Sequence, residues 1–345
     1  MTETVFIITI DTEGDNLWAR PARVTTENAR FLPRFQALCE RHGFPPTYLV
    51  NYEMALDPAF QAFGHKVVRE GGGEVGLHVH PWYSPPGAER FDPAAPHQYL
   101  YELPDDLIAA KVGALTDLLA RTFEVRPVSH RAGKWGFDER VARVLVDHGY
   151  LVDCSVTPGL SWRRIPGGPN GRGGPDFTGF PLVPYMLDLD DVRRPGVSSL
   201  LEVPVTVRPT YAPLLERMHA RVREGLAGAA LRKVLGPPYV WLRPNGRNLD
   251  TLLALVEWGV AQRLPALEFM LHSSELMPGG SPTFHTAGAI DVLYTHLGRL
   301  FGRLASLGVK GATLARFRRG WAGTEAAQPS RERGERGSSG REVHA

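Results

Sequence analysis

Short apolar runs that alternate with helical patterns constrain the fold of this chain more than any other feature. The runs are rich in Val, Ile, Tyr and Phe, which favour the buried surface of a sheet. They cover residues 5–10, 47–51, 74–80, 128–130, 151–155, 200–207, 239–243 and 267–271. Apolar residues at helical spacing lie between them, at about 28–41, after Pro104, after Asp138, and at about 249–262 and 290–307. Strands alternating with helices favour parallel pairing, so about eight such strands predict an α/β fold with a complete or incomplete barrel.

Length and composition favour a single large domain. The chain has 345 residues, of which 43% are hydrophobic, enough for a sizeable core. We expect the domain to cover residues 1–320. The Gly-, Pro- and Arg-rich stretch 159–176 predicts a surface loop, which begins a loop insertion at 159–198. Residues 324–345 are polar with interleaved Arg and Glu, and we expect a disordered tail there.

Charge and targeting signals exclude several classes of partner. Lys and Arg number 39 against 37 for Asp and Glu, so nothing in the charge predicts binding to nucleic acid or to an anionic membrane. The two cysteines argue against a disulfide framework. No stretch is long enough to cross a bilayer, and the N-terminus lacks the basic leader of a secretory signal. We therefore expect a cytoplasmic protein without a transmembrane segment.

Two short segments carry groups that can bind a metal. Residues 74–82 read EVGLHVHPW, with His78 and His80 two apart at the end of a predicted strand. Side chains two apart on a strand point the same way, so both imidazoles can hold one metal. Residues 9–15 read TIDTEGD, with Asp11 and Glu13 after an apolar strand. Acids placed there are costly unless they are paired, solvated or metal-bound.

Three further residues stand at or inside apolar runs. Arg131 follows a predicted strand in SHRAGKWG, Asp153 lies inside the run in YLVDCSVTP, and His272 ends the last run in FMLHSSEL. The candidates that share the carboxyl end of a predicted strand are Asp11, Glu13, His78, His80, Arg131 and His272. In a parallel barrel these ends meet on one face, which carries the active site.

Taken in chain order, these segments resemble the motifs of the polysaccharide deacetylase, or NodB-homology, family of carbohydrate esterases. Asp11 and Glu13 match its acidic first motif, and Glu74-Val75-Gly76 followed by His78 and His80 matches its second. The segment 46–50, PTYLV, resembles a further strand of the family, and the Arg131, Asp153 and His272 segments resemble its third, fourth and fifth motifs. Similarity runs from about residue 5 to 318. The resemblance implies a distorted barrel of about seven or eight strand–helix units.

Two features depart from the common pattern of that family. Thr12 separates the two acids, which are usually adjacent, and one residue rather than three separates the histidines. The geometry of the metal site is therefore less constrained by the resemblance than its location is.

The resemblance also implies a function and a division of roles. A divalent metal, which we expect to be Zn²⁺, would be held by His78, His80 and one carboxylate. Arg131 would keep the basic carboxylate ionised, His272 would protonate the leaving group, and Asp153 would orient His272 or its neighbours. Glu13 has the longer side chain and lies further past the end of the strand, where the histidine nitrogens should converge. This position and the family pattern both favour Glu13 as ligand and Asp11 as base. Trp82 and Trp135 flank the motifs and could stack on a sugar ring or simply pack the barrel rim.

The implied reaction is removal of an acetyl or formyl group from an N-acylated sugar or a related biosynthetic intermediate. Rival hypotheses are a deacylase for a non-sugar amide, another metallohydrolase, an iron oxygenase, and an inactive sugar-binding protein on the same fold. Amidohydrolases carry their His-x-His on the first strand, whereas here the acidic pair comes first and the histidines follow. Iron oxygenases are usually built from antiparallel strands, whereas the alternating pattern here predicts parallel ones.

Overall fold

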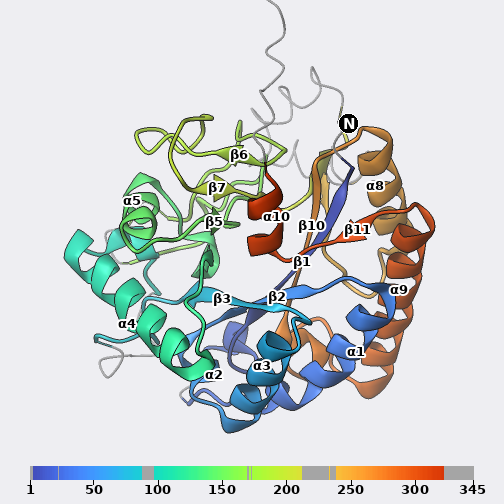
Figure 1. Ribbon diagram of the computed structural model, residues 1–345, viewed down its shortest axis with the longest axis horizontal. Helices are drawn as coiled ribbons and strands as arrows, with labels where there is room; N and C mark the ends of the chain where they lie inside the picture. Colours follow the sequence, from blue (N-terminus) through green and yellow to red (C-terminus); the bar gives the residue numbers. More distant parts are fainter. Residues whose placement is uncertain are drawn as a thin grey trace, which may run out of the picture.

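A curled sheet forms the centre of the molecule. The computed structural model describes residues 3–21, 23–87, 97–168, 171, 173–211, 233 and 238–321. Nine strands form the sheet: β1 (Val5–Thr12), β2 (Pro46–Val50), β3 (Glu74–Val79), β4 (Ser129–Ala132), β5 (Val152–Asp153), β6 (Tyr185–Met186), β7 (Leu201–Glu202), β10 (Ala266–His272) and β11 (Lys310–Gly311). The order is β10-β1-β2-β3-β4-β5-β7-β6, with β11 beside β1 (Figure 1). Only β6 runs antiparallel to its neighbour.

Hydrogen bonds outside the strand ladders draw the two sides of the sheet together. The backbone N–H of Thr206 donates to the carbonyl of Glu268 at 3.1 Å, and the N–H of Glu268 donates to Thr206 Oγ1 at 2.7 Å. These bonds join the segment after β7 to β10. The sheet is thus a distorted barrel, and the predicted α/β fold is confirmed.

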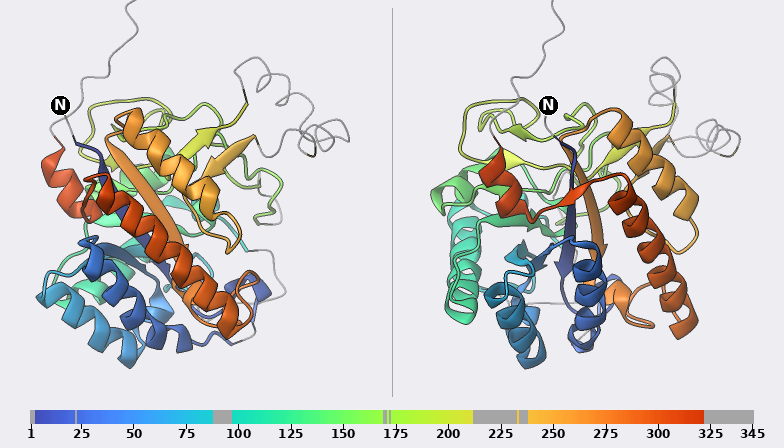
Figure 2. Two further views of the ribbon diagram at one scale, coloured as in Figure 1. Left: turned by 90° about the vertical axis from the view of Figure 1, so that its right-hand side faces the viewer. Right: turned by 45° about the vertical axis from the view of Figure 1, so that its right-hand side comes forward.

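Helices cover the outer surface of the curled sheet (Figures 1 and 2). They are α1 (Leu32–His42), α2 (Tyr52–Ala55), α3 (Pro58–Arg69), α4 (Asp105–Phe123), α5 (Glu139–Asp147), α8 (Leu249–Ala261), α9 (Ala287–Ser306) and α10 (Leu314–Gly320). The predicted stripe on α4 is fully buried: Ile108, Val112, Leu115 and Leu119 are each 0% exposed. Asp138 caps α5, as predicted, by accepting from the N–H groups of Arg140 and Val141. Helix α3 lies where no helix was predicted.

Two predicted strands differ from the structure. The run 200–207 is divided into β7 and β8 (Val207–Pro209), because Pro204 between them has no N–H for a sheet ladder. The run 239–243 forms β9 (Tyr239–Trp241), which pairs antiparallel with β8 in a separate two-stranded ribbon. Figure 2 shows this ribbon standing away from the main sheet. The expectation that this run belongs to the parallel barrel is therefore wrong.

The region proposed as an insertion, 159–198, contains little regular structure. Its only strand among the described residues is β6, and Ser161 and Asp176 form an isolated bridge. The hydroxyl of Tyr99 donates to the carbonyl of Ile165 at 2.9 Å, which fastens this loop beside the barrel. The predicted tail, 324–345, lies outside the described residues.

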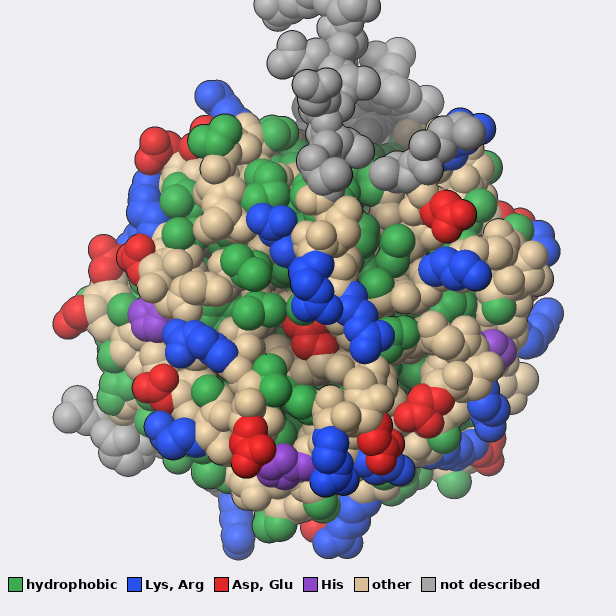
Figure 3. All heavy atoms as spheres, viewed as in Figure 1, with side chains coloured by type: hydrophobic (Ala, Val, Ile, Leu, Met, Phe, Trp, Pro, Cys, Tyr) green, Lys and Arg blue, Asp and Glu red, His purple; other side chains and the backbone are tan. Residues whose placement is uncertain are grey.

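Charges of both signs are interspersed over the face seen in Figure 3. Lys and Arg side chains gather there over α10, which carries Arg316, Arg318 and Arg319. Among the described helices, none is both long and apolar enough to cross a membrane.

Candidate active site

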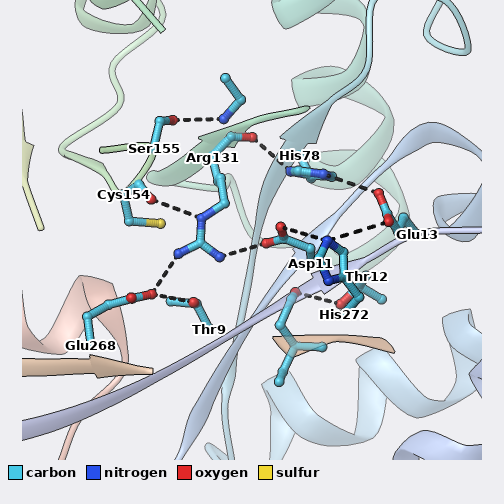
Figure 4. Close-up of polar contacts among 12 residues, drawn as sticks. Thr9, Asp11, Thr12, Glu13, His78, Arg131, Cys154, Ser155, Glu268 and His272 are labelled. Carbon is cyan, nitrogen blue, oxygen red and sulfur yellow. Dashed lines mark hydrogen bonds and ion pairs between the residues drawn. The ribbon is translucent and has the colours of Figure 1, made fainter. Parts of the chain in front are cut away.

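The carboxyl ends of β10, β1, β3 and β4 bring the candidate residues together. Asp11 is the register partner of His272 across β1 and β10, and His78 is the partner of Arg131 across β3 and β4. Glu13 follows β1 by one residue. Figure 4 shows the side chains of Asp11, Glu13, His78 and His272 pointing toward one another. The predicted clustering at the carboxyl ends of the strands is thus present in the structure.

Glu13, His78 and His80 form a buried group that could hold a metal ion. Glu13 Oε2 lies 2.8 Å from His80 Nε2 and 3.4 Å from His78 Nε2. One ligand atom from each residue lies within 4.8 Å of the others, and all three side chains are buried. Two imidazoles and a carboxylate form a common donor set for zinc. His78 lies in β3 and His80 one residue past its end, and both rings reach Glu13 from one side, as their spacing predicts.

Hydrogen bonds around this group fix its orientation. His78 Nδ1 lies 2.9 Å from the carbonyl of Arg131 and is placed to donate to it, which turns Nε2 toward Glu13. The N–H of Glu13 donates to Ser273 Oγ at 3.1 Å, and Asn28 Nδ2 donates to the carbonyl of Glu13 at 2.9 Å. Burial works to raise the pKa of Glu13, but hydrogen bonds with His78 and His80 outweigh it and hold that pKa well below its usual range.

The His80 ring packs against the backbone of Gly133. A Cβ at position 133 would lie 2.5 Å from His80 Nδ1 and 2.7 Å from Cε1. These distances are shorter than any van der Waals contact, so the ring occupies space that a side chain at 133 would need. The position of the imidazole thus depends on glycine following β4.

Arg131 is fully buried and links two carboxylates. Its Nη1 donates to Asp11 Oδ1 at 2.7 Å and its Nη2 to Glu268 Oε1 at 2.6 Å, while Nε donates to the carbonyl of Cys154 at 2.9 Å. Thr9 Oγ1 also donates to Glu268. Burial works to raise the pKa of Asp11, but the charge of Arg131, together with those of His78 and His272, outweighs it and lowers that pKa. For Glu268 burial prevails, and its pKa is raised.

His272 stands at the other side of the group. Its Nε2 lies 3.7 Å from Asp11 Oδ2 and 3.8 Å from Glu13 Oε1. Its Nδ1 lies 3.0 Å from Glu275 Oε2, an oxygen that Arg243 Nη2 also reaches at 3.1 Å. One nitrogen of the ring is therefore oriented by Glu275, and the other faces the acids.

These side chains line a cavity of about 330 Å³. Trp82 and Trp135, the two predicted substrate-binding residues, both line it, together with Trp18 and Trp162. Trp135 lies 6.1 Å from Trp162, ring centre to ring centre, and the two rings are nearly parallel. Aromatic walls next to a polar floor are typical of small-molecule sites.

Asp153 does not take the place expected for it. Its side chain is fully buried, and its carboxylate contacts His130 Nδ1 at 2.6 Å and Ser155 Oγ at 3.0 Å. The expectation that it orients His272 is wrong, because β5 places it opposite His130 on β4, away from β10. Its contribution to the site is indirect, since Ser155 Oγ accepts from the N–H of Ala132, next to Arg131.

The sequence analysis missed Glu268, Glu275 and Arg243. Glu268 is a lone acid inside the apolar strand ALEFMLH, the same signal that singled out Asp153. Glu275 lies three residues after His272, a spacing that allows its carboxylate to accept from the N–H of His272 at 3.0 Å. Arg243 carries no comparable signal, because its neighbour His272 is distant in sequence.

Comparison with known proteins identifies the fold. No protein-family model matches the sequence, and no curated protein matches it. A Mycobacterium smegmatis protein assigned as a polysaccharide deacetylase superimposes with a TM-score of 0.54 at 14% identity, over 92% of this chain and 90% of that one. This chain therefore has the fold seen in that protein, which is the fold that the sequence motifs predicted.

Two other solved structures align with lower scores. They are a 4-alpha-glucanotransferase from Thermococcus litoralis (TM-score 0.49, 12% identity, 92% of this chain and 40% of that one) and a family 4 carbohydrate esterase from Streptomyces lividans in complex with acetate (TM-score 0.40, 10% identity, 90% and 93%).

Proposed function

We propose that this protein is a metal-dependent hydrolase that removes an acetyl or formyl group from an N-acylated sugar or a related biosynthetic intermediate. The observation that carries the proposal is the convergence of Glu13 Oε2 on both His78 Nε2 and His80 Nε2. An ionised carboxylate between two imidazoles, beside a second carboxylate and a third imidazole, suits hydrolysis better than structural packing.

Glu13, His78 and His80 would hold the metal, and zinc fits their donor types. His78 meets a further requirement, since its Nδ1 is placed to donate to a backbone carbonyl and its Nε2 faces the other two donors. When bound, the metal would polarise the acyl carbonyl and acidify water.

Asp11 and His272 would move the protons. Asp11 would accept a proton from the attacking water as its oxygen bonds to the acyl carbon. Arg131 engages Oδ1 and keeps the carboxylate ionised, so that Oδ2 faces the cavity. His272 Nε2 would then donate a proton to the amine nitrogen as the bond between carbon and nitrogen breaks. Glu275 holds the other ring nitrogen and would stabilise the protonated ring.

The cavity walls favour a ring-shaped substrate. Trp82 and Trp135 could stack against the apolar face of a sugar. The cavity volume of about 330 Å³ lies in the range of sites for small ligands.

Acyl release from defined substrates tests this function. The protein, prepared with a chelator and then reloaded with zinc, is incubated with N-acetyl and N-formyl sugars and with a simple N-acetyl amine that has no sugar. We expect mass spectrometry to show loss of the acyl group from the sugars in the zinc-loaded sample alone. Hydrolysis of the simple amine in preference to the sugars would support a non-sugar deacylase. Binding of sugars without hydrolysis of any of them would overturn the proposal in favour of an inactive sugar-binding protein.

A further inference from the structure

Three cationic side chains line the same cavity as the candidate metal ligands: Arg20, Lys134 and Arg243. They come from separate parts of the chain, after the 3-10 turn Leu17–Ala19, after β4 and after β9. Lys134 and Arg243 are half-buried, so their charges need partners, whereas Arg20 is exposed and is solvated by water until a ligand reaches it.

Other charges of the site are already balanced. Asp11 is paired with Arg131 at 2.7 Å, and Arg243 is paired with Glu275 at 3.1 Å. Glu13 is a candidate metal ligand, and a bound cation would offset its charge. In the ranges that the structure describes, by contrast, no carboxylate oxygen lies within ion-pair distance of Arg20 or of Lys134. Among the residues that line the cavity, these two cations have no contacting carboxylate, although the charge of Glu102, outside the lining, acts on Lys134 from a greater distance.

Lys134 is held inward by its backbone and by neutral groups. Its Nζ donates to the carbonyls of His97 and Pro166, each at 2.9 Å, and lies 4.2 Å from the centre of the Tyr99 ring. Its φ of 54° is in the left-handed region, and the φ of Trp135 is 62°. Two such residues in succession cost free energy, and backbone strain of this kind concentrates at functional sites. Burial lowers the pKa of Lys134 to about 8, and the opposing charge of Glu102 does not offset it.

The cations lie one aromatic ring away from the candidate metal ligands. The Trp82 ring is 4.6 Å from that of His80, 4.4 Å from that of His97, and 5.7 Å from Lys134 Nζ. Arg20 and Lys134 are close enough for Arg20 to lower the pKa of Lys134. A ring seated on the tryptophans could thus place its acyl group at the acids and a negative substituent at the cations.

We propose that the substrate of this site is an acylated sugar that carries an anionic group, either phosphate or carboxylate, and that Arg20 and Lys134 bind this group. The inference rests on the proposed deacylase function and adds the charge of its substrate. Both anions share the same recognition chemistry, namely oxygen acceptors for ammonium and guanidinium donors.

The test compares sugars that differ only in charge. N-acetylglucosamine, its 6-phosphate and the corresponding N-acetylated uronic acid are offered to the zinc-loaded protein, and kcat/KM and binding are measured. Binding is followed through quenching of tryptophan fluorescence. We expect at least one anionic sugar to be preferred over the neutral sugar about tenfold or more, and we expect salt to reduce that preference. The phosphate and uronate arms tell which anion is recognised.

Variants assign the preference to the two cations. Lys134→Asn removes the charge and keeps a residue that tolerates a positive φ, and Arg20→Gln removes the other charge. Each should reduce the ratio of anionic to neutral kcat/KM about tenfold, mainly through KM, and Lys134→Arg should restore much of it. The exposed Lys66→Met and Arg41→Gln, both remote from the cavity, serve as controls and should leave the ratio unchanged.

The outcomes separate this inference from the proposed function. Hydrolysis of neutral and anionic sugars at equal rates would overturn the inference and leave the deacylase function standing. Binding of an anionic sugar that depends on Lys134, without loss of its acyl group, would support the inference and contradict the function. A drop in kcat/KM that is equal for all three sugars in Lys134→Asn would show a structural role for Lys134 and would also overturn the inference.

Discussion

Arg131 Nη1 lies 2.7 Å from Asp11 Oδ1, and these side chains are 0% and 4% exposed. The pair joins the middle of β4 to the end of β1 across two intervening strands. Since Arg131 occupies one oxygen of Asp11, the other is left toward the cavity. The same contact therefore orients the carboxylate and sets its charge.

Asp11 and Glu13 should respond differently to loss of their charge. Asp11→Asn should bind zinc normally and be nearly inactive, because Asp11 pairs with Arg131 and stands outside the group of Glu13, His78 and His80. Glu13→Gln should bind zinc weakly and regain some activity at high zinc concentration, because Glu13 contacts both histidines. Zinc titration followed by activity measurements checks both variants. The reverse pattern would exchange the two roles and keep the metallohydrolase hypothesis.

Removing both histidines of the candidate metal site should abolish metal binding. We expect close to one zinc per chain in the native protein and almost none in His78→Ala/His80→Ala, since Glu13 alone offers too few donors. Elemental analysis after gel filtration measures the content. His285→Ala, an exposed histidine outside the cavity, is the matched control. Unchanged metal in the double variant would place the metal elsewhere.

His272 should matter for turnover and not for metal content. His272→Ala should keep its zinc and lose about 10²–10⁴-fold in kcat, the usual range for general acid–base catalysis. Glu275→Gln should reduce kcat less and should shift the pH profile, because it removes the negative charge 3.0 Å from His272 Nδ1. Steady-state kinetics across pH, with parallel zinc analysis, distinguishes the two effects. Joint loss of zinc and activity in His272→Ala would instead make His272 a ligand.

Arg131→Met should destabilise the fold strongly. The variant leaves Asp11 and Glu268 buried without their shared cation, and removal of one partner from a buried pair costs about 3–5 kcal/mol. Chemical denaturation measures the free energy of unfolding. Arg34→Met breaks an ion pair whose side chains are 55% and 69% exposed, and it should cost about 1 kcal/mol or less. Similar costs for the two variants would contradict the importance of burial here.

Glu202 should make the protein less stable as pH rises. Burial, together with the nearby charge of Asp153, raises the pKa of Glu202 well above its usual value. The stability from this group is complete below the unfolded pKa of about 4.3 and is lost as pH rises toward the folded value. Glu202→Gln lacks this loss, so its stability relative to the native protein should increase from pH 4.5 to pH 8. Urea denaturation across this range, with the exposed Glu70→Gln as control, would show no such trend if Glu202 is ionised in the folded state.

The sequence predicted most of the site because its residues stand at strand ends. Asp11, His78, Arg131 and His272 each follow or end an apolar run, and parallel pairing alone brings such ends together. The role given to Asp153 came from the family resemblance and was misplaced, since the order of strands, which the sequence does not reveal, puts β5 beside β4 and far from β10.

Residues that contact the site residues from within a strand or a loop were harder to predict. Glu268 pairs with Arg131, 137 positions earlier in the chain, and a single sequence offers no measure of such a contact. The run 239–243 has the composition of a barrel strand, yet tertiary packing makes it an antiparallel ribbon. The amino-acid composition of a run indicates that it forms a half-buried strand, but it does not indicate which sheet that strand joins.

The site requires that residue 133 has no Cβ atom, and Gly133 meets this requirement. Any amino acid with a Cβ at this position would place that carbon 2.5 Å from His80 Nδ1. Even alanine, the smallest such replacement, would require the His80 ring or the backbone after β4 to shift. A protein engineer who transplants this centre into another barrel must therefore keep a glycine at the position of Gly133, as well as the three donor side chains.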